Sequence, residues 1–379
     1  MTTTKNNEHK KLNVPNLRFP EFQGEWEKCK LGDLCNVLMC KRILASQTNT
    51  EEGVPFYKIG TIGNAPDAYI SKELFDDYKT KYNYPHKGEV MITCAGTVGK
   101  CVIYDGKDAY YQDSNIVWID NPSQCISNSF LYHLLAKVDW RKLNSTTIIR
   151  IYNDDLRNLK LSYPQIEEQQ KISCLLSFLD ERISTQNKII DKLQSLIKGI
   201  SNKIFESLQG QECRLGDIAT ITNGNSNVQD AVTEYRDDLY PFFDRSEEIK
   251  YLPTFLFDKE AIIYPGEGAD FFPRYINGKF ALHQRCYAIF DFNKAVNPQF
   301  LYCFLKTQNS YFIRNAVGST VPSLRLDTFQ KLKVIVPSKK TQSIVSSLLF
   351  TLEKKHNSEK MLLQTLLKQK QYLLFQMFI

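Results

Sequence analysis

The sequence predicts an α+β protein in which two similar globular heads are joined by two long helices. Three observations predict this class: an internal duplication, short β-type runs in each copy, and a long apolar-periodic segment closing each copy. The 379 residues suffice for two domains with their own cores. A period this long indicates a duplicated domain, because solenoid repeats run to tens of residues.

The duplication is carried by short motifs that recur in the same order. Lys30-Leu31-Gly32-Asp33-Leu34 returns as Arg214-Leu215-Gly216-Asp217-Ile218, and from Ser145 onward the second copy follows the first at a constant offset of 173 residues. We therefore divide the chain into five parts. They are a disordered lead-in (1–16), head one (17–165), a first long helix (166–209), head two (210–337) and a second long helix (338–379).

Head one alternates β-type runs with turn residues. Its elements, in order, are expected to be strands at 89–93, 101–104 and 115–119, a helix at 128–138 and a strand at 159–163 that Pro164 ends. Head two repeats this pattern.

The two long segments have heptad spacing. In the first, nine of ten stripe positions from Ile172 to Ile204 are apolar. Neither helix is stable alone in water, so we expect them to pack together. Since head two lies between them, the chain leaves and re-enters at one place, which makes the coiled coil antiparallel and the two heads pseudo-twofold related.

The second stripe contains three polar residues, His356, Glu359 and Lys370. They are consistent with a buried polar layer that fixes register, with a widened gap for a partner subunit, or with simple exposure. We favour simple exposure.

Composition excludes several classes of protein. Ten cysteines without a Cys-x-x-Cys pair and only five histidines disfavour a zinc site, and no cofactor is expected. The net charge of +6 permits a polyanionic partner without requiring one. With no signal peptide or long apolar run, a cytoplasmic protein that does not bind membranes is expected.

Several motifs resemble the specificity subunit of type I restriction-modification enzymes, and the resemblance covers essentially the whole chain. They are Pro15-Asn16-Leu17-Arg18-Phe19-Pro20-Glu21-Phe22 with Trp26-Glu27, then Leu31-Gly32-Asp33-Leu34, and Pro164-Gln165-Ile166-Glu167-Glu168-Gln169-Gln170-Lys171-Ile172 at the first helix entry. At the second entry, Lys339-Lys340-Thr341-Gln342-Ser343 departs from this pattern and keeps only Pro337 and Gln342.

The resemblance implies a function without catalysis by this chain. Each head would be a target recognition domain that reads half of a bipartite double-stranded DNA site. The helices would set the spacer and bind two methyltransferase subunits, through residues such as Gln169, Gln170, Ile172 and Gln342. Nuclease-translocase subunits would complete the restriction enzyme, and catalysis would lie in these partners.

Three motifs suggest an enzyme instead. Asn297-Pro298-Gln299-Phe300 resembles a methyltransferase loop but fails at its third position, and a helix cap explains it. Pro66-Asp67 with Asp77-Tyr78-Lys79 matches a loose nuclease pattern without strand character. The turn Ala95-Gly96-Thr97-Val98-Gly99-Lys100 evokes a P-loop but lacks its first glycine and its final hydroxyl. Two interpretations of this turn remain, a contact with a DNA phosphate and a simple hairpin turn.

Corresponding positions that differ between the copies are candidates for reading different half-sites. We align residues 111–115 with 283–287, where Asn115 suits adenine N6/N7 and Arg285 suits guanine O6/N7. Exposed loop chemistry explains each residue equally well. The candidate DNA-binding residues are Lys58, Thr97, Lys100, Ser114, Asn115, Arg245, Arg274, His283 and Arg285, with Lys58 and Arg245 as a parallel pair.

Helix length gives a spacer estimate. About 38 helical residues at about 1.5 Å each span roughly 57 Å, or roughly 17 base pairs. Two rival functions remain: a coiled-coil assembly scaffold that does not read DNA, and a self-sufficient methyltransferase or nuclease.

Overall fold

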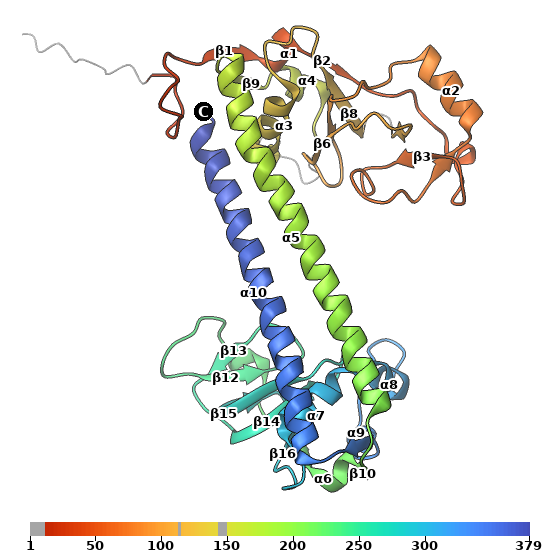
Figure 1. Cartoon of the computed structure of the whole chain (residues 1–379), viewed down its shortest axis with the longest axis vertical. Helices are drawn as coiled ribbons and strands as arrows, with labels where there is room; N and C mark the ends of the chain where they lie inside the picture. The colour runs from red at the N-terminus through yellow and green to blue at the C-terminus, as the bar shows by residue number, and fades with distance from the viewer. Residues whose placement is uncertain (1–11, 113–114, 143–149) are drawn as a thin grey trace, which may run out of the picture. The chain divides into compact units, whose positions relative to one another are not determined.

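The structure, a computed structural model, describes residues 12–112, 115–142 and 150–379. The chain divides into two compact units, Met1–Thr185 with Leu363–Ile379, and Gln186–Leu362. Figure 1 shows that each unit contains one head and part of each long helix. Both units combine short strands with helices, so the predicted α+β class is confirmed.

Head one is built from three small sheets. Their strand orders are β1-β9, β2-β8-β5-β6 and β4-β3-β7, and every pair is antiparallel except β3–β7. Before the first long helix the elements are β1 (Glu27–Lys30), α1 (Leu31–Leu34), β2 (Asn36–Leu38), η1 (Ala45–Gln47), β3 (Val54–Tyr57), β4 (Tyr69–Ile70), α2 (Lys72–Lys81), β5 (Val90–Thr93), β6 (Cys101–Ile103), β7 (Tyr110–Tyr111), β8 (Ile116–Asp120), α3 (Asn128–Lys137), η2 (Trp140–Lys142), α4 (Asn153–Arg157) and β9 (Lys160–Tyr163).

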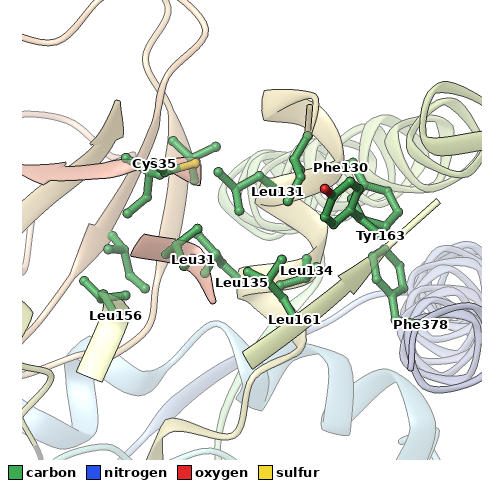
Figure 2. Close-up of a cluster of buried hydrophobic side chains, with 14 of the residues drawn as sticks. Leu31, Cys35, Phe130, Leu131, Leu134, Leu135, Leu156, Leu161, Tyr163 and Phe378 are labelled. Carbon is green, nitrogen blue, oxygen red and sulfur yellow. The ribbon is translucent and has the colours of Figure 1, made fainter. Parts of the chain in front are cut away.

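The core of head one gathers around α3, as Figure 2 shows. Phe130 on α3 is fully buried and stacks on Phe378, with ring centroids 4.9 Å apart. Trp26 meets both rings edge-on. Burying one such ring contributes about 2–3 kcal/mol, so the last residues of the chain help to hold this core together.

Head two has one larger sheet. Its strand order is β11-β16-β14-β15-β12-β13, and β10–β17 repeats the β1–β9 pair of head one. The elements are β10 (Gln211–Arg214), α6 (Leu215–Ile218), β11 (Thr220–Asn223), η3 (Val228–Asp230), β12 (Tyr240–Phe243), β13 (Lys250–Leu252), β14 (Phe257–Pro265), β15 (Arg274–Leu282), β16 (Cys286–Phe290), α7 (Pro298–Lys306), α8 (Asn309–Asn315), α9 (Leu326–Gln330) and β17 (Lys333–Val336).

The long helices are α5 (Ile166–Ser207) and α10 (Lys339–Met377), and they run antiparallel within each unit. In the first unit, Met377 packs in the cluster of Ile172, while the Lys370 ammonium donates to the Asp180 carboxylate. As the residue number rises along α5, the number of the contacting residue on α10 falls, which shows that the two helices are antiparallel. In the second unit, Ile200 and Ile204 of α5 pack in one cluster with Val345 and Leu349 of α10. Among the described residues, no helix has an apolar stretch long enough to cross a membrane.

The polar residues of the second stripe are not simply exposed, so that expectation was wrong. Gln186 Nε2 donates to the Glu359 carboxylate over 2.6 Å, and the side chain of Glu359 is only 12% exposed. Lys370 is 18% exposed and pairs with Asp180, while Nε2 of His356 is buried. Within their own units, Glu359 and Lys370 therefore make partly buried polar contacts with α5, which lies closer to the alternative of a polar layer than to simple exposure.

A buried glutamine joins each head to its long helix. Gln169 accepts from the Ser127 N–H over 2.7 Å and donates to the carbonyls of Cys125 and Pro164, both at 2.8 Å. In the second copy, Gln342 makes the same three bonds: Oε1 accepts from Asn297 N over 2.6 Å, and Nε2 donates to the carbonyls of Ala295 and Pro337, both at 2.9 Å. Neither glutamine is exposed.

The segment before β1 is packed, although residues 1–16 were expected to form a disordered lead-in. The first 11 residues lie outside the described part of the chain. Asn13 is buried, and its amide donates to the Trp26 carbonyl over 2.6 Å. Leu17 N donates to the Gln376 carbonyl over 2.9 Å. Residues 12–16 therefore belong to the first unit.

Candidate nucleic-acid interface

A cavity in head two collects several of the predicted DNA-binding residues. Strands β12 and β15 run parallel, with Phe243 opposite Leu282, so the loops that follow them begin side by side. The His283 N–H donates to the Phe243 carbonyl over 2.9 Å and continues this pairing. The cavity has a volume of about 530 Å³ and is lined by Val228, Asp244, Arg245, Ser246, Lys250, Glu267, His283, Gln284, Arg285 and Cys286.

The cavity is lined by the carboxylate of Asp244, whose charge is balanced by a lysine of the same head. Asp244 is buried and accepts from the Lys250 ammonium over 2.7 Å and from the Ser246 hydroxyl over 2.5 Å. Burial alone would raise the pKa of Asp244, but these hydrogen bonds outweigh it and hold the pKa below its ordinary value. Asp244 therefore stays charged and fixes the loop.

Arg274 stabilises the same loop by hydrogen bonds to its backbone. Its guanidinium donates to the Asp244 and Ser246 carbonyls, the latter over 2.9 Å, and lies 4.8 Å from the centre of the Phe243 ring. Burial lowers the pKa of Arg274 from its ordinary value. Two of its donors are thus occupied by the protein itself, and it is not among the residues that line the cavity.

Arg245, His283 and Arg285 face the cavity with different charges. Burial lowers the pKa of His283, so the ring is neutral at pH 7, and its Nδ1 accepts from the Arg285 N–H over 3.2 Å. Arg285 pairs with Glu267 at 2.8 Å. The exposed Arg245 makes no ion pair or hydrogen bond with another described residue and supplies unneutralised positive charge.

Head one repeats the parallel strand pair with aromatic residues. Tyr57 on β3 lies opposite Tyr111 on β7, their rings stack with centroids 5.7 Å apart, and Gln112 N donates to the Tyr57 carbonyl over 2.9 Å. The next residue, Lys58, pairs with Asp67 at 3.2 Å, and both side chains are exposed. Ser114 lies outside the described residues.

The turn between β5 and β6 carries Thr97 and Lys100. Thr93 fixes it: its hydroxyl donates to the Thr97 carbonyl and accepts from Lys100 N, and its carbonyl accepts from Gly99 N over 2.8 Å. The Lys100 ammonium donates to the Ile62 carbonyl over 2.5 Å, so it joins this turn to the loop after β3. Thr97 is exposed. A separate cavity in head one, of about 550 Å³ around Lys79, Tyr84 and Trp118, is lined by none of the predicted residues.

Strand pairing corrects the alignment of the two heads. Thr93 lies opposite Ile116 in head one and Pro265 lies opposite Cys286 in head two, so Ile116 corresponds to Cys286. Asn115 therefore corresponds to Arg285, and not to Tyr287 as the sequence alignment had it. By the same criterion Gln112 corresponds to His283, and Lys58 to Asp244 rather than to Arg245. The motif alignment missed this because head one has two residues between Gln112 and Asn115, whereas head two has one between His283 and Arg285.

Glu267, Lys250 and Asp244 were not among the predicted site residues. Glu267 lies in Gly266-Glu267-Gly268 directly after β14, where head one has Cys94-Ala95-Gly96 after β5. The sequence signal that could have identified Glu267 is that a charged residue stands where the other copy has Ala95. Lys250 follows its partner Asp244 by six residues in a polar segment, and such spacing carries no recognisable pattern.

The residues predicted to bind partners lie at the helix entries. Gln169 and Gln342 use their amides within the chain, as described above, and Ile172 is 1% exposed in the core of head one. Gln170 is exposed and available for contact.

The enzyme-like motifs have structural explanations. The Asn297 side chain accepts from Gln299 N over 2.9 Å, and Pro298 occupies the first turn of α7, so the capping interpretation is confirmed. Asp77 pairs with Lys81, and Lys79 pairs with Asp108, on the surface of head one. No group of three or more His, Cys, Asp or Glu residues suited to a metal ion occurs in the part of the chain that the structure describes.

Comparison with known proteins places these features in a family. Residues 23–195 and 210–368 both match the model of the type I restriction modification DNA specificity domain. The chain is 48% identical over 177 residues to a protein of Haemophilus influenzae named as a type I restriction enzyme specificity subunit, covering 47% of this chain and 45% of that protein. It is 30% identical over 138 residues to the EcoDI specificity subunit of Escherichia coli, covering 36% and 30%. The chain thus matches less than half the length of these relatives.

Two solved structures share the fold. The S subunit of a type I restriction-modification system from M. genitalium aligns with a TM-score of 0.66 at 19% identity, over 97% of this chain and 99% of that one. A chain from a structure concerned with assembly of a type I system aligns with a TM-score of 0.54 at 14% identity, over 92% and 96%. Because the family model matches most of the chain in two copies, the protein belongs to the family of type I restriction-modification DNA specificity proteins.

Proposed function

We propose that this chain is the DNA-recognition subunit of a type I restriction-modification enzyme and that each head reads one half of a bipartite target. The observation that carries the proposal is the cavity of head two, where Arg245, His283 and Arg285 meet at the ends of two parallel strands. Arginine donors on a fixed loop suit base edges in the major groove, and an unpaired arginine suits a phosphate.

The corresponding loops of head one support a second reading surface with other chemistry. Tyr57, Tyr111 and Asn115 stand where head two has Phe243, Leu282 and Arg285. Two heads with the same frame and different loop residues suit two different half-sites. A scaffold that does not read DNA has no need of such loops, so we favour DNA recognition over the scaffold alternative.

Catalysis is assigned to partner subunits. The methyltransferase-like motif at Asn297 is a helix cap, and the acids of the nuclease-like motif are paired with lysines. We propose that two methyltransferase subunits bind along the helical region, with the exposed Gln170 at one contact, and that nuclease-translocase subunits join this complex.

Binding to a duplex library with randomised base pairs tests the proposal. The full chain, alone and together with its methyltransferase subunits, should enrich two short motifs separated by a spacer of fixed length. A library that remains unselected in both samples contradicts DNA recognition and favours the scaffold.

A second experiment tests whether the helices set the spacer. Seven residues added to both α5 and α10 lengthen each by about 10 Å and should lengthen the preferred spacer by about three base pairs. An unchanged spacer contradicts this part of the proposal.

A further inference from the structure

The ion pair between Arg285 and Glu267 leaves one edge of the guanidinium unused. Both oxygens of Glu267 accept from the same nitrogen, Nη1, over 2.8 and 2.9 Å. Among the described residues, Nε and Nη2 of Arg285 have no acceptor. The Arg285 side chain is 63% exposed and that of Glu267 is 19% exposed, so the carboxylate is the more buried partner and much of the Arg285 side chain is open to solvent.

The backbone under Arg285 is fixed by close packing. A Cβ atom on Gly266 would lie 2.0 Å from the Arg285 carbonyl oxygen, and one on Gly224 would lie 2.0 Å from the Leu282 carbonyl oxygen. Only glycine permits these approaches. Together with the bond from Arg285 N to His283 Nδ1, they hold the loop in one position. A reading residue requires such support, because its donors must meet a base edge within a fraction of an ångström.

The free edge has the geometry of a base reader. Nε and Nη2 are two parallel donors, and guanine presents two neighbouring acceptors, O6 and N7, in the major groove. An ion pair with one largely exposed partner adds little to stability, so the contribution of Glu267 is orientation rather than folding energy. Lysine at this position would keep the charge and lose the paired donors.

Head one has an asparagine at the corresponding position. Asn115 immediately precedes β8 as Arg285 immediately precedes β16, and its carbonyl accepts from Cys94 N over 2.8 Å. A side-chain amide offers one donor and one acceptor, which matches N7 and N6 of adenine.

We propose that Arg285 reads a guanine in the half-site of head two, that Glu267 is the residue that positions it, and that Asn115 reads an adenine from the same position in head one. This inference rests on the proposed function and assigns its first base contacts. It also predicts that the two half-sites differ where these positions meet the DNA.

Selection from the randomised duplex library tests it with the full chain and its methyltransferase subunits. The unchanged chain should require guanine at one position of one half-site. Arg285→Ala and Arg285→Lys should both lose that requirement, by about tenfold to a hundredfold in relative affinity, while all other positions keep their preference. Arg285→Asn should shift the preference from guanine toward adenine. Arg236→Ala removes an exposed arginine that does not line the cavity and should change nothing.

Glu267→Gln separates positioning from contact. It keeps a hydrogen-bond acceptor but loses the charge, so binding should persist while discrimination for guanine falls several-fold. In head one, Asn115→Ala should abolish a preference for adenine in the other half-site only.

Three results would overturn the inference. One is an unchanged guanine preference in Arg285→Ala. Another is a loss of affinity in Arg285→Ala that is equal for all sequences, is accompanied by a salt dependence lower by about one charge, and is restored in Arg285→Lys. That combination marks a phosphate contact. The third is a Glu267→Gln chain with full discrimination. Each leaves the proposed function intact, whereas an unselective parent chain contradicts the proposed function itself.

Discussion

Gln186 and Glu359 are hydrogen-bonded across the two long helices, and 173 residues separate them, which is the offset between the two repeats. Each is therefore the counterpart of the other, and the two copies of the helix meet at the same position of the repeat. Gln186 is 5% exposed and interrupts an otherwise apolar stripe. A single buried polar contact of this kind specifies register at a cost in stability.

Replacement of one partner of this contact should destabilise the helix pair. Gln186→Leu leaves the Glu359 carboxylate without its amide donor, and we expect a loss of about 1–3 kcal/mol in unfolding free energy, measured by urea titration. The double variant Gln186→Leu/Glu359→Leu should recover most of that loss. Gln194→Leu, at an exposed position of α5, is the matched control and should be neutral. A double variant as unstable as the single variant would contradict the coupling.

The two neighbouring glutamines at the first helix entry should behave in opposite ways. Gln169→Leu leaves a buried N–H and two carbonyls without their side-chain partner, so we expect a loss of about 2–4 kcal/mol in unfolding free energy. Gln170→Leu should leave stability unchanged, because Gln170 is exposed, and weaken co-purification with the methyltransferase subunit. Equal stability of the two variants would show that the internal bonds of Gln169 do not matter.

The cap at Asn297 should affect folding and not chemistry. Asn297→Ala removes the acceptor for the first turn of α7, and we expect it to cost about 1 kcal/mol in thermal or urea unfolding. Asn297→Ser should restore most of this, because serine also caps helices. DNA methylation by the assembled enzyme should be unchanged in both variants. Loss of methylation in a stably folded Asn297→Ser chain would instead revive the methyltransferase interpretation.

His133 should make the first unit sensitive to mild acid. It is 1% exposed on α3, and burial lowers its pKa to about 4; the nearby Asp180 carboxylate, at 3.9 Å, offsets this only in part because the Lys370 ammonium pairs with it. The unfolded chain protonates this residue near pH 6.5, so unfolding takes up a proton between these values. Stability is therefore complete above about pH 6.5 and should fall by roughly 3 kcal/mol as the pH drops to about 4.

Urea titration across this range, followed for the parent chain and two variants, measures the effect. His133→Leu should remove one proton from the pH dependence, whereas His86→Gln, at a side chain that is 87% exposed, should leave it unchanged. A parent chain and a His133→Leu variant with parallel pH profiles would contradict a depressed pKa.

Much of the fold was predictable because it follows from periodic patterns and duplication. The heptad stripe from Ile172 to Ile204 predicts a long helix, and α5 extends over that range. The duplicated Leu-Gly-Asp motif follows the first strand of each copy, β1 and β10, and forms the equivalent short helices α1 and α6. The contact between Glu359 and Gln186 was not predictable, because a polar residue in a heptad stripe gives the same sequence pattern whether it is exposed or hydrogen-bonded to the other helix.

The candidate site was predictable only as a set of loops. His283, Arg285 and Arg245 were identified as charged or polar residues near strand ends, and the parallel pairing of β12 with β15 brings them to one cavity. Arg274 has the same residue type but lies under the loop, because its donors meet the Asp244 and Ser246 carbonyls. Side-chain direction of this kind depends on strand register, which the sequence does not encode in a readable pattern.

The hydrogen bonds that the side chains of Gln169 and Gln342 form with other described residues all go to backbone groups. The partners are the N–H of Ser127 or Asn297 and the carbonyls of Cys125 or Ala295, so these hydrogen bonds do not depend on side chains of the head. A head of different sequence keeps these hydrogen bonds as long as its chain enters α3 or α7 in the same way. Exchange of a head between related chains would therefore preserve these hydrogen bonds, and head one would in addition have to keep its packing against Ile172 and Phe378.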